Sequence, residues 1–334
     1  MADWDQLQLL IKSMKANEGM KSWNAAVAQW RAADPKFRPN LENMNQEMSD
    51  LTGADLYCAN LRNAILDYAR FDKCVLDGAD FTGVQLQNGS FRVARVSSAI
   101  FDKATLGECH FDHATIHGTR FHEAYLVAAS FVQTDCSKIL LGACNMKKAC
   151  FQAAIVTGLD FSKCELAEAN FAQIKGENSK FEGAKLVDIH FEQAELPKAS
   201  FANSQFKNAH FKGARLDGAN FQGAKLVAVD FAGASLAGAT FQGATLQGVD
   251  FTEANLQGAQ LPSGDLEGAK FFEGDGKTPE PPARCSKPAK LASQEIDALG
   301  INAKRKERLK ILLGYEQPKT FVQKIFGGFG KRRE

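Results

Sequence analysis

Proline, tyrosine and tryptophan are scarce in this sequence, which has 9, 4 and 3 of them among 334 residues. Phenylalanine, by contrast, occurs 25 times. A chain that uses one aromatic residue so selectively has many equivalent interior sites of one shape.

Long apolar runs are also absent. No stretch reaches the roughly 18 consecutive apolar residues of a membrane-spanning helix. The first residues, Met1 to Asp5, lack the basic start and apolar core of a secretory signal peptide. We therefore expect a cytoplasmic protein with reduced cysteines, and leave export by a signal-less route open.

Residues that carry chemistry do not gather into a recognisable site. No cysteine pair has the spacing of a zinc ribbon, and reduced thiols are favoured over a strained disulfide between Cys144 and Cys164. His110, His113 and His117 are close in sequence, and we interpret them as solvated surface side chains rather than metal ligands. No phosphate-binding glycine loop and no serine–histidine–aspartate arrangement is present. We predict no catalytic residues, no metal, no cofactor and no enzyme activity.

A repeat of five residues runs through most of the chain. Stepping by five from Leu51 to Phe271 gives 45 consecutive units without insertion or deletion. The stepped position, here called the central position, holds 20 Phe and 19 Leu. Two residues earlier, the small position holds Ala in 27 of the 45 units. Such a register over residues 49–273 predicts one continuous array.

A second period of twenty residues is superimposed on the first. The series that runs from Phe71 to Phe271 in steps of twenty is Phe throughout, and the two series beside it are mostly Leu. A period of five fits neither an α-helix nor a flat strand, so the chain must turn after each unit. Four turns close a square coil of twenty residues. We expect these Phe side chains in the core: Phe71, Phe81, Phe91, Phe101, Phe161, Phe181, Phe221 and Phe241.

Several units resemble the A(D/N)LXX pattern of pentapeptide-repeat proteins, among them Ala54-Asp55-Leu56, Ala79-Asp80-Phe81 and Ala169-Asn170-Phe171. The resemblance implies an all-β solenoid, a right-handed quadrilateral β-helix with the central and small positions inside. About eleven coils spaced by about 4.8 Å would form a rod about 50–55 Å long. Upstream, Trp23-Asn24 and Trp30-Arg31 are similar to the helical lead-in of bacterial members.

The two ends of the chain differ from the array. Apolar stripes at helical spacing predict that residues 1–48 form a helical cap over the first coil, whose edge would otherwise be exposed. Residues 274–288 contain Gly, Pro and charge, which predicts a linker. Residues 289–334 predict a basic helical tail; residues 274–334 together hold 14 basic and 7 acidic side chains.

The middle of the array, residues 139–189, departs from its own rule. Ile139, Leu159, Ile174 and Ile189 are large residues at small positions, and Gly176 leaves a central position empty. Local repacking is one interpretation. The other is a partner-binding irregularity, with the outward apolar residues Leu140 and Ile155 as part of a binding surface.

These features favour a non-enzymatic scaffold that presents a rod-shaped surface to an unidentified protein partner. A membrane-tethered adaptor or secreted effector is an alternative. In a membrane-tethered adaptor, the C-terminal tail would contact a membrane surface or a partner weakly. The candidate tether comprises Phe321, Ile325, Phe326, Phe329, Lys324, Lys331, Arg332 and Arg333.

A further alternative is mimicry of DNA, because some pentapeptide-repeat proteins protect topoisomerases such as gyrase by imitating a duplex. The candidate acidic surface comprises Asp230, Asp250, Glu253, Asp265 and Glu267. The array holds 20 basic and 26 acidic residues, however, whereas duplex DNA carries about one charge per 1.7 Å. We expect no direct binding of nucleic acid, and the sequence does not indicate the oligomeric state.

Overall fold

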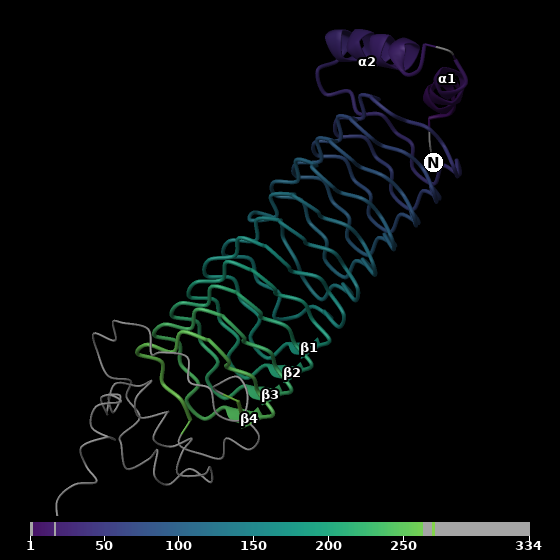
Figure 1. Ribbon diagram of the computed structural model, residues 1–334. Coiled ribbons are helices and arrows are strands. Elements are labelled where there is room, and N and C mark those ends of the chain that lie inside the picture. Colours follow the sequence, from purple (N-terminus) through teal and green to yellow (C-terminus); the bar gives the residue numbers. More distant parts are fainter. Residues whose placement is uncertain (1–2, 17, 263–268, 271–334) are drawn as a thin grey trace, which may run out of the picture.

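The computed structural model describes residues 3–16, 18–262 and 269–270. It is a rod with two helices at its N-terminal end (Figure 1). The predicted linker at 274–288 and tail at 289–334 lie outside the described residues. So do all eight residues of the candidate tether.

The rod is a β-helix with a coil of twenty residues. Nearly every described residue before a central position pairs in parallel with the residue twenty places on, as in Asp55 with Val75 and Asp80 with Ile100. Near the C-terminal end the pairing is regular enough to form short strands, which lie in one four-stranded parallel sheet. They are β1 (Lys185–Val187), β2 (Gln205–Lys207), β3 (Lys225–Val227) and β4 (Thr245–Gln247). The β-helix predicted from the sequence is thereby confirmed.

Coil pairing begins upstream of residue 49. Asn40 pairs with Asn60, and Asn45 pairs with Ile65. Leu41 and Met44 are buried like the inward residues of later coils. Gln46 occupies the next central position. Because glutamine is polar, the apolar periodicity of the sequence does not extend to this coil.

The core is built from columns of stacked Phe rings. Rings one coil apart lie nearly parallel, with centroids 4.6 Å apart for Phe81 and Phe101. Rings on opposite walls meet edge to face, as Phe71 and Phe81 do at 5.6 Å. All eight Phe residues predicted for the core are fully buried. Offset stacking and edge-to-face contact are the arrangements that aromatic quadrupoles favour, so the rings stabilise both coil stacking and the square cross-section.

The last residue of nearly every unit has a positive φ, whichever residue stands there. Gly223 has φ 67° and Lys73 has φ 58°. An L-residue is strained in this region, whereas glycine adopts it freely. The many glycines at this position relieve that strain at the corners of the square.

Two helices cover the first coil: α1 (Trp4–Met14) and α2 (Lys21–Ala33). The amide of Asn24 on α2 donates to the Gly53 carbonyl and accepts from the Asp55 amide, at 2.9 and 2.8 Å. The Trp23 indole donates to the Asp55 carbonyl at 2.9 Å. Side chains of α2 thus replace the backbone partners that a preceding coil would supply, and the exposed strand edge is satisfied.

Among the described residues, no helix combines the length and apolarity that a membrane crossing needs.

We expect Phe161→Ala to lower the free energy of unfolding by about 3–5 kcal/mol, because the ring is fully buried and its loss leaves a cavity. Lys163 lies two residues away and is exposed, so Lys163→Ala should change it by no more than about 0.5 kcal/mol. Chemical denaturation of both variants measures the difference. Equal tolerance of the two changes would contradict the inward position of Phe161.

Candidate interaction surface

Asp and Asn residues that precede a central position serve their own turns. Asp80 accepts the backbone N–H of Thr82 at 2.9 Å, and Asn170 accepts that of Ala172 at 2.9 Å. The same contact, two residues on, is made by Asp230 to Ala232 and by Asp250 to Thr252. Short polar side chains favour such turns because they mimic a backbone carbonyl. This explains why Asp and Asn recur at this position of the repeat.

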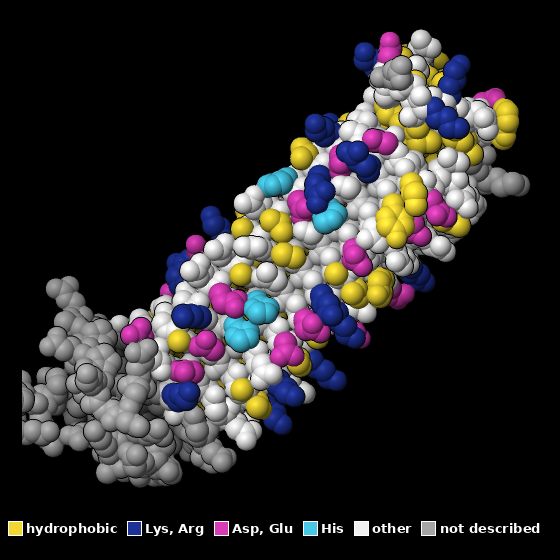
Figure 2. Space-filling model, turned by 45° about the vertical axis from the view of Figure 1, so that its right-hand side comes forward, with side chains coloured by type: hydrophobic (Ala, Val, Ile, Leu, Met, Phe, Trp, Pro, Cys, Tyr) yellow, Lys and Arg dark blue, Asp and Glu magenta, His cyan; other side chains and the backbone are white. Residues whose placement is uncertain are grey.

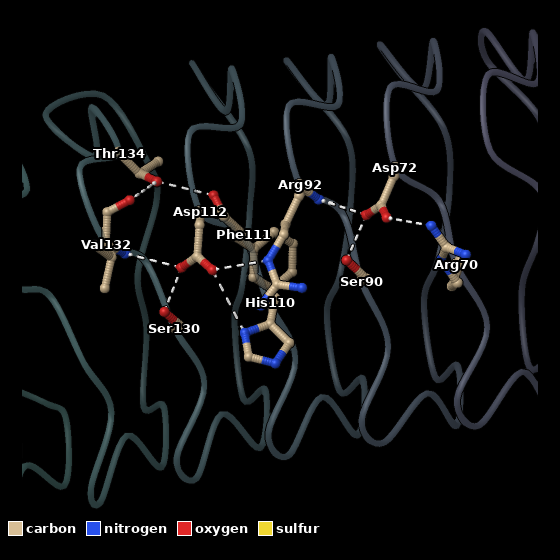
Figure 3. Close-up of polar contacts among 10 residues, drawn as sticks. All are labelled: Arg70, Asp72, Ser90, Arg92, His110, Phe111, Asp112, Ser130, Val132 and Thr134. Carbon is tan, nitrogen blue, oxygen red and sulfur yellow. Dashed lines mark hydrogen bonds and ion pairs between the residues drawn. The ribbon is translucent and has the colours of Figure 1, made fainter.

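Other carboxylates link one coil to the next, as Figure 3 shows. Asp112 accepts from the Val132 amide at 3.2 Å and from the hydroxyl of Ser130 one coil further on. The Arg92 guanidinium, one coil back, lies 3.2 Å from the same carboxylate, and His110 Nδ1 lies 3.5 Å away. Asp72 repeats the pattern with Ser90 and the Arg92 amide. These carboxylates are therefore occupied by contacts within the rod.

Acidic and basic side chains are interspersed on the face that Figure 2 shows, and histidines lie among them. Ion pairs join adjacent coils, for example Arg120 with Asp102 at 2.8 Å and Lys147 with Glu165 at 2.7 Å. His190 and His210 stack with centroids 5.0 Å apart. Within the described residues, no three His, Cys, Asp or Glu side chains are grouped to hold a metal ion.

Three of the five residues of the candidate acidic surface, Asp230, Asp250 and Glu253, lie among the described residues. Asp230 and Asp250 are engaged in their turns, and Asp250 also lies 3.9 Å from Lys270. Glu253 occupies a left-handed corner position with φ 58°. Asp265 and Glu267 lie outside the described residues. The three described residues lie at regular positions of the repeat.

The regular pairing between coils is interrupted in the middle of the rod. Along the described array the series of paired residues is broken at two neighbouring places, between Leu140 and Asp160 and between Glu165 and Lys185. Three corner residues lack the positive φ of their equivalents elsewhere; they are Lys138, Ala143 and Lys163. The backbone hydrogen bonds that would join residues 138–143 to residues 158–163 on the next coil are therefore missing, and we call this gap the open ladder.

Oversized side chains explain this opening. Ile139 and Leu159 occupy small positions of the same wall on adjacent coils, and both are buried. Elsewhere this column holds Ala, Ser or Thr. The added volume displaces Leu141, which stands where Phe121 and Phe161 stand on neighbouring coils. Leu141 is partly exposed, unlike every other described residue at a central position from Leu51 to Leu261.

Gly176 leaves no void in the column, because its neighbours move in. A Cβ atom added there would lie 2.9 Å from Val156 and 2.9 Å from Leu196, the central residues one coil away on each side. Ile174 and Ile189 are fully buried. This part of the irregularity is local repacking.

The opening coincides with exposed apolar side chains. Leu140 is 56% exposed, and Ile155, one wall before it on the next coil, is 39% exposed. The imidazole of His122 lies against Gly142, where a Cβ atom would come within 2.0 Å of Nδ1. We call Leu140, Leu141, Ile155, Lys138 and Lys163 the Leu140 surface. The sequence indicated Leu140 and Ile155 as part of a binding surface, but not Leu141. The feature that could have indicated Leu141 is a Leu in a column that is mostly Phe.

Neither Lys138 nor Lys163 forms an ion pair with another described residue, and both are exposed at corners beside the open ladder. The Leu140 surface therefore combines apolar side chains with two exposed lysines, and Lys163 also helps to lower the pKa of the Asp160 carboxyl. Interfaces commonly have an apolar centre and a polar rim.

Burial by itself raises the pKa of Asp50, Asp80, Asp135 and Asp160, but hydrogen bonds from the hydroxyl and amide of the Ser or Thr two residues on outweigh it and lower the pKa below its ordinary value of 3.8. The unfolded chain then binds protons more readily than the folded one in acid. The stabilisation is present above pH 3.8 and is lost as the pH falls through the lower, folded-state pKa.

We expect the variant with Asn at these four positions to lose less stability than the natural chain between about pH 5 and about pH 2. Asn accepts the same backbone N–H, as Asn170 shows, but does not titrate. Thermal unfolding across this pH range measures the effect. Parallel pH profiles for the two proteins would contradict it.

Comparison with known families and structures gives consistent matches. The family model for a pentapeptide repeat region matches residues 144–221 and 194–274, and that for pentapeptide repeats (8 copies) matches residues 54–92. No curated protein matches the chain.

Solved structures with similarity include HetL, a pentapeptide repeat protein involved in heterocyst differentiation regulation from the cyanobacterium Nostoc sp. strain PCC 7120. It is 26% identical over 70% of this chain and 94% of its own, with a TM-score of 0.33. QnrB1, a plasmid-mediated fluoroquinolone resistance protein, is 15% identical over 69% of this chain and 96% of its own, with a TM-score of 0.32.

Proposed function

Because this chain belongs to the pentapeptide-repeat family, we propose that it is a non-enzymatic scaffold that binds a protein partner through the Leu140 surface. The observation that carries the proposal is the coincidence of exposed Leu140 with the open backbone ladder at 138–143. Single exposed apolar side chains are ordinary on a protein surface. Here Leu140 lies where the regular coil gives way, and Ile155 lies on the regularly paired wall before it.

The chemistry of the surface specifies its partner. Leu140, Leu141 and Ile155 offer apolar contact, while Lys138 and Lys163 lie at neighbouring corners without an ion-pair partner in the described structure. An apolar side chain flanked by carboxylates is complementary to this arrangement, because opposite charge at a rim guides encounter and orientation. We assign the scaffold a protein partner of that character.

The Leu140 surface is tested by Leu140→Glu, with Val93→Glu as the matched control. Both residues are 56% exposed, but Val93 lies on another wall, where the coils are regularly paired. We expect Leu140→Glu to weaken retention of the partner by roughly tenfold or more, whereas Val93→Glu leaves it unchanged. Quantitative affinity purification with the intact chain measures retention.

Thermal unfolding of both variants checks that the rod is intact, since neither side chain is in the core. Equal retention of the same proteins by Leu140→Glu, Val93→Glu and the natural chain would remove the Leu140 surface from the proposal. Versions that lack residues 1–48 or 274–334 then show whether binding depends on an end of the chain.

Mimicry of DNA has less support from the charges of the array. Asp230 and Asp250 accept hydrogen bonds within their own turns, and basic side chains are interspersed with acidic ones on the rod. A scaffold of this kind leaves gyrase unaffected. We therefore expect no inhibition or protection of gyrase supercoiling by the purified protein at micromolar concentration. Inhibition at that level would replace the scaffold with the topoisomerase alternative.

A further inference from the structure

Two cysteines are stacked directly on adjacent coils beside the Leu140 surface. Cys144 and Cys164 occupy the same inward small position one coil apart, and the residues that follow them, Asn145 and Glu165, are paired in parallel. The Glu165 amide donates to the Cys144 carbonyl at 3.0 Å. The two side chains are therefore held in register on one side.

The two thiols lie at equivalent positions of adjacent coils. The Cys164 thiol lies 3.5 Å from the Gly142 carbonyl, and the Cys144 thiol donates to the Phe121 carbonyl at 2.8 Å. Because a thiolate at Cys144 accepts a hydrogen bond from Cys164, this contact lowers the pKa of Cys144 and raises that of Cys164. A thiolate is the form of cysteine that reacts with oxidants.

Other buried cysteines of the rod provide a comparison. Cys74 and Cys109 each donate to a backbone carbonyl, at 2.9 and 2.8 Å, as Cys144 does to the Phe121 carbonyl at 2.8 Å. Burial raises the pKa of Cys74 to about 12 and raises those of Cys109 and Cys136 as well. Cys164 is 7% exposed, more than any of these three. Among the described cysteines, Cys144 is 1% exposed, like Cys74, so the stacked pair reaches solvent through Cys164.

The open ladder gives the pair the freedom that a covalent link needs. A disulfide requires Cβ atoms about 3.5–4.5 Å apart, whereas neighbouring strands are spaced by about 4.7–4.9 Å. The coils must therefore approach slightly. Between residues 138–143 and 158–163 the paired hydrogen bonds that would resist this movement are missing, while Asn145 and Glu165 anchor the other side.

We propose that Cys144 and Cys164 form a reversible disulfide between adjacent coils when the protein meets a peroxide. One thiolate attacks an oxygen of hydrogen peroxide, the O–O bond breaks, and a sulfenic acid and hydroxide form, the latter taking a proton to become water. The second thiol attacks the sulfenic sulfur, the S–O bond breaks, and a second water leaves. Two thiols are oxidised to one disulfide as one peroxide is reduced to two waters.

The disulfide joins the coils immediately beside Leu141 and Gly142. It fixes the spacing of the segments that carry the Leu140 surface, so oxidation restricts the part of the rod in which backbone pairing is open. This inference concerns the cysteines alone and stands whether or not the Leu140 surface binds a partner.

Exposure of the intact protein to hydrogen peroxide, followed by alkylation, digestion and mass spectrometry, tests the proposal. We expect a linked peptide joining Cys144 to Cys164 that disappears on reduction. These two thiols should be lost roughly tenfold or more faster than those of Cys74, Cys109 and Cys136, because reactivity follows thiolate character and access.

Cys144→Ser and Cys164→Ser should each abolish the link, with Cys109→Ser as the matched control that retains it. Serine occurs naturally at small positions, as Ser179 and Ser204 show. In a second measurement, amide hydrogen exchange at residues 138–143 should slow on oxidation of the natural chain and of Cys109→Ser, but not of Cys144→Ser.

Two outcomes would overturn the proposal. One is that Cys144 and Cys164 stay alkylatable at a peroxide concentration that oxidises the partly exposed Cys58 and Cys150. The other is that either residue links to a different cysteine. Failure of Leu140→Glu to affect a partner would leave this result unchanged, so the two proposals are tested separately.

Discussion

Parallel pairing of each residue with the one twenty places along the chain is the constraint from which the structure follows. Pairing at this spacing places identical positions above one another, so each inward residue meets its own equivalents. Phe rings consequently stack on Phe rings, as Phe221 does on Phe241 at 4.8 Å. A coil cannot satisfy its backbone or bury its rings alone, and the stability of the rod accrues from contacts between neighbours. The side chains of α2 supply those contacts where the first coil has no neighbour.

The same constraint organises the polar surface. Since equivalent outward positions also lie above one another, a carboxylate such as Asp112 reaches both the coil before it and the coil after it. Others, such as Asp80, fold back to the amide two residues on. Individual surface ion pairs contribute little to stability. Their effect here is to neutralise charge along the columns.

A stacked fold also confines the effect of a departure from its rule. Ile139 and Leu159 lie in one column, so their added volume acts on one wall and displaces Leu141 there. Tightly packed interiors do not absorb an additional methylene without a shift of neighbouring atoms. The open ladder and the displacement of Leu141 arise together from this one local excess of side-chain volume.

The five-residue and twenty-residue periods determined the β-helix and its inward Phe columns, because each central residue is read directly from its spacing. Apolar stripes at helical spacing predicted the helices at the N-terminal end. The two periods did not reveal that coil pairing starts at Asn40, since Gln46 interrupts the apolar pattern. They placed Cys144 and Cys164 one coil apart, but they did not show that Leu141 is displaced or that the ladder beside the cysteines is open. Those features depend on how side chains of adjacent coils share interior volume. Only the three-dimensional packing decides that, because residues twenty apart in the chain become nearest neighbours there.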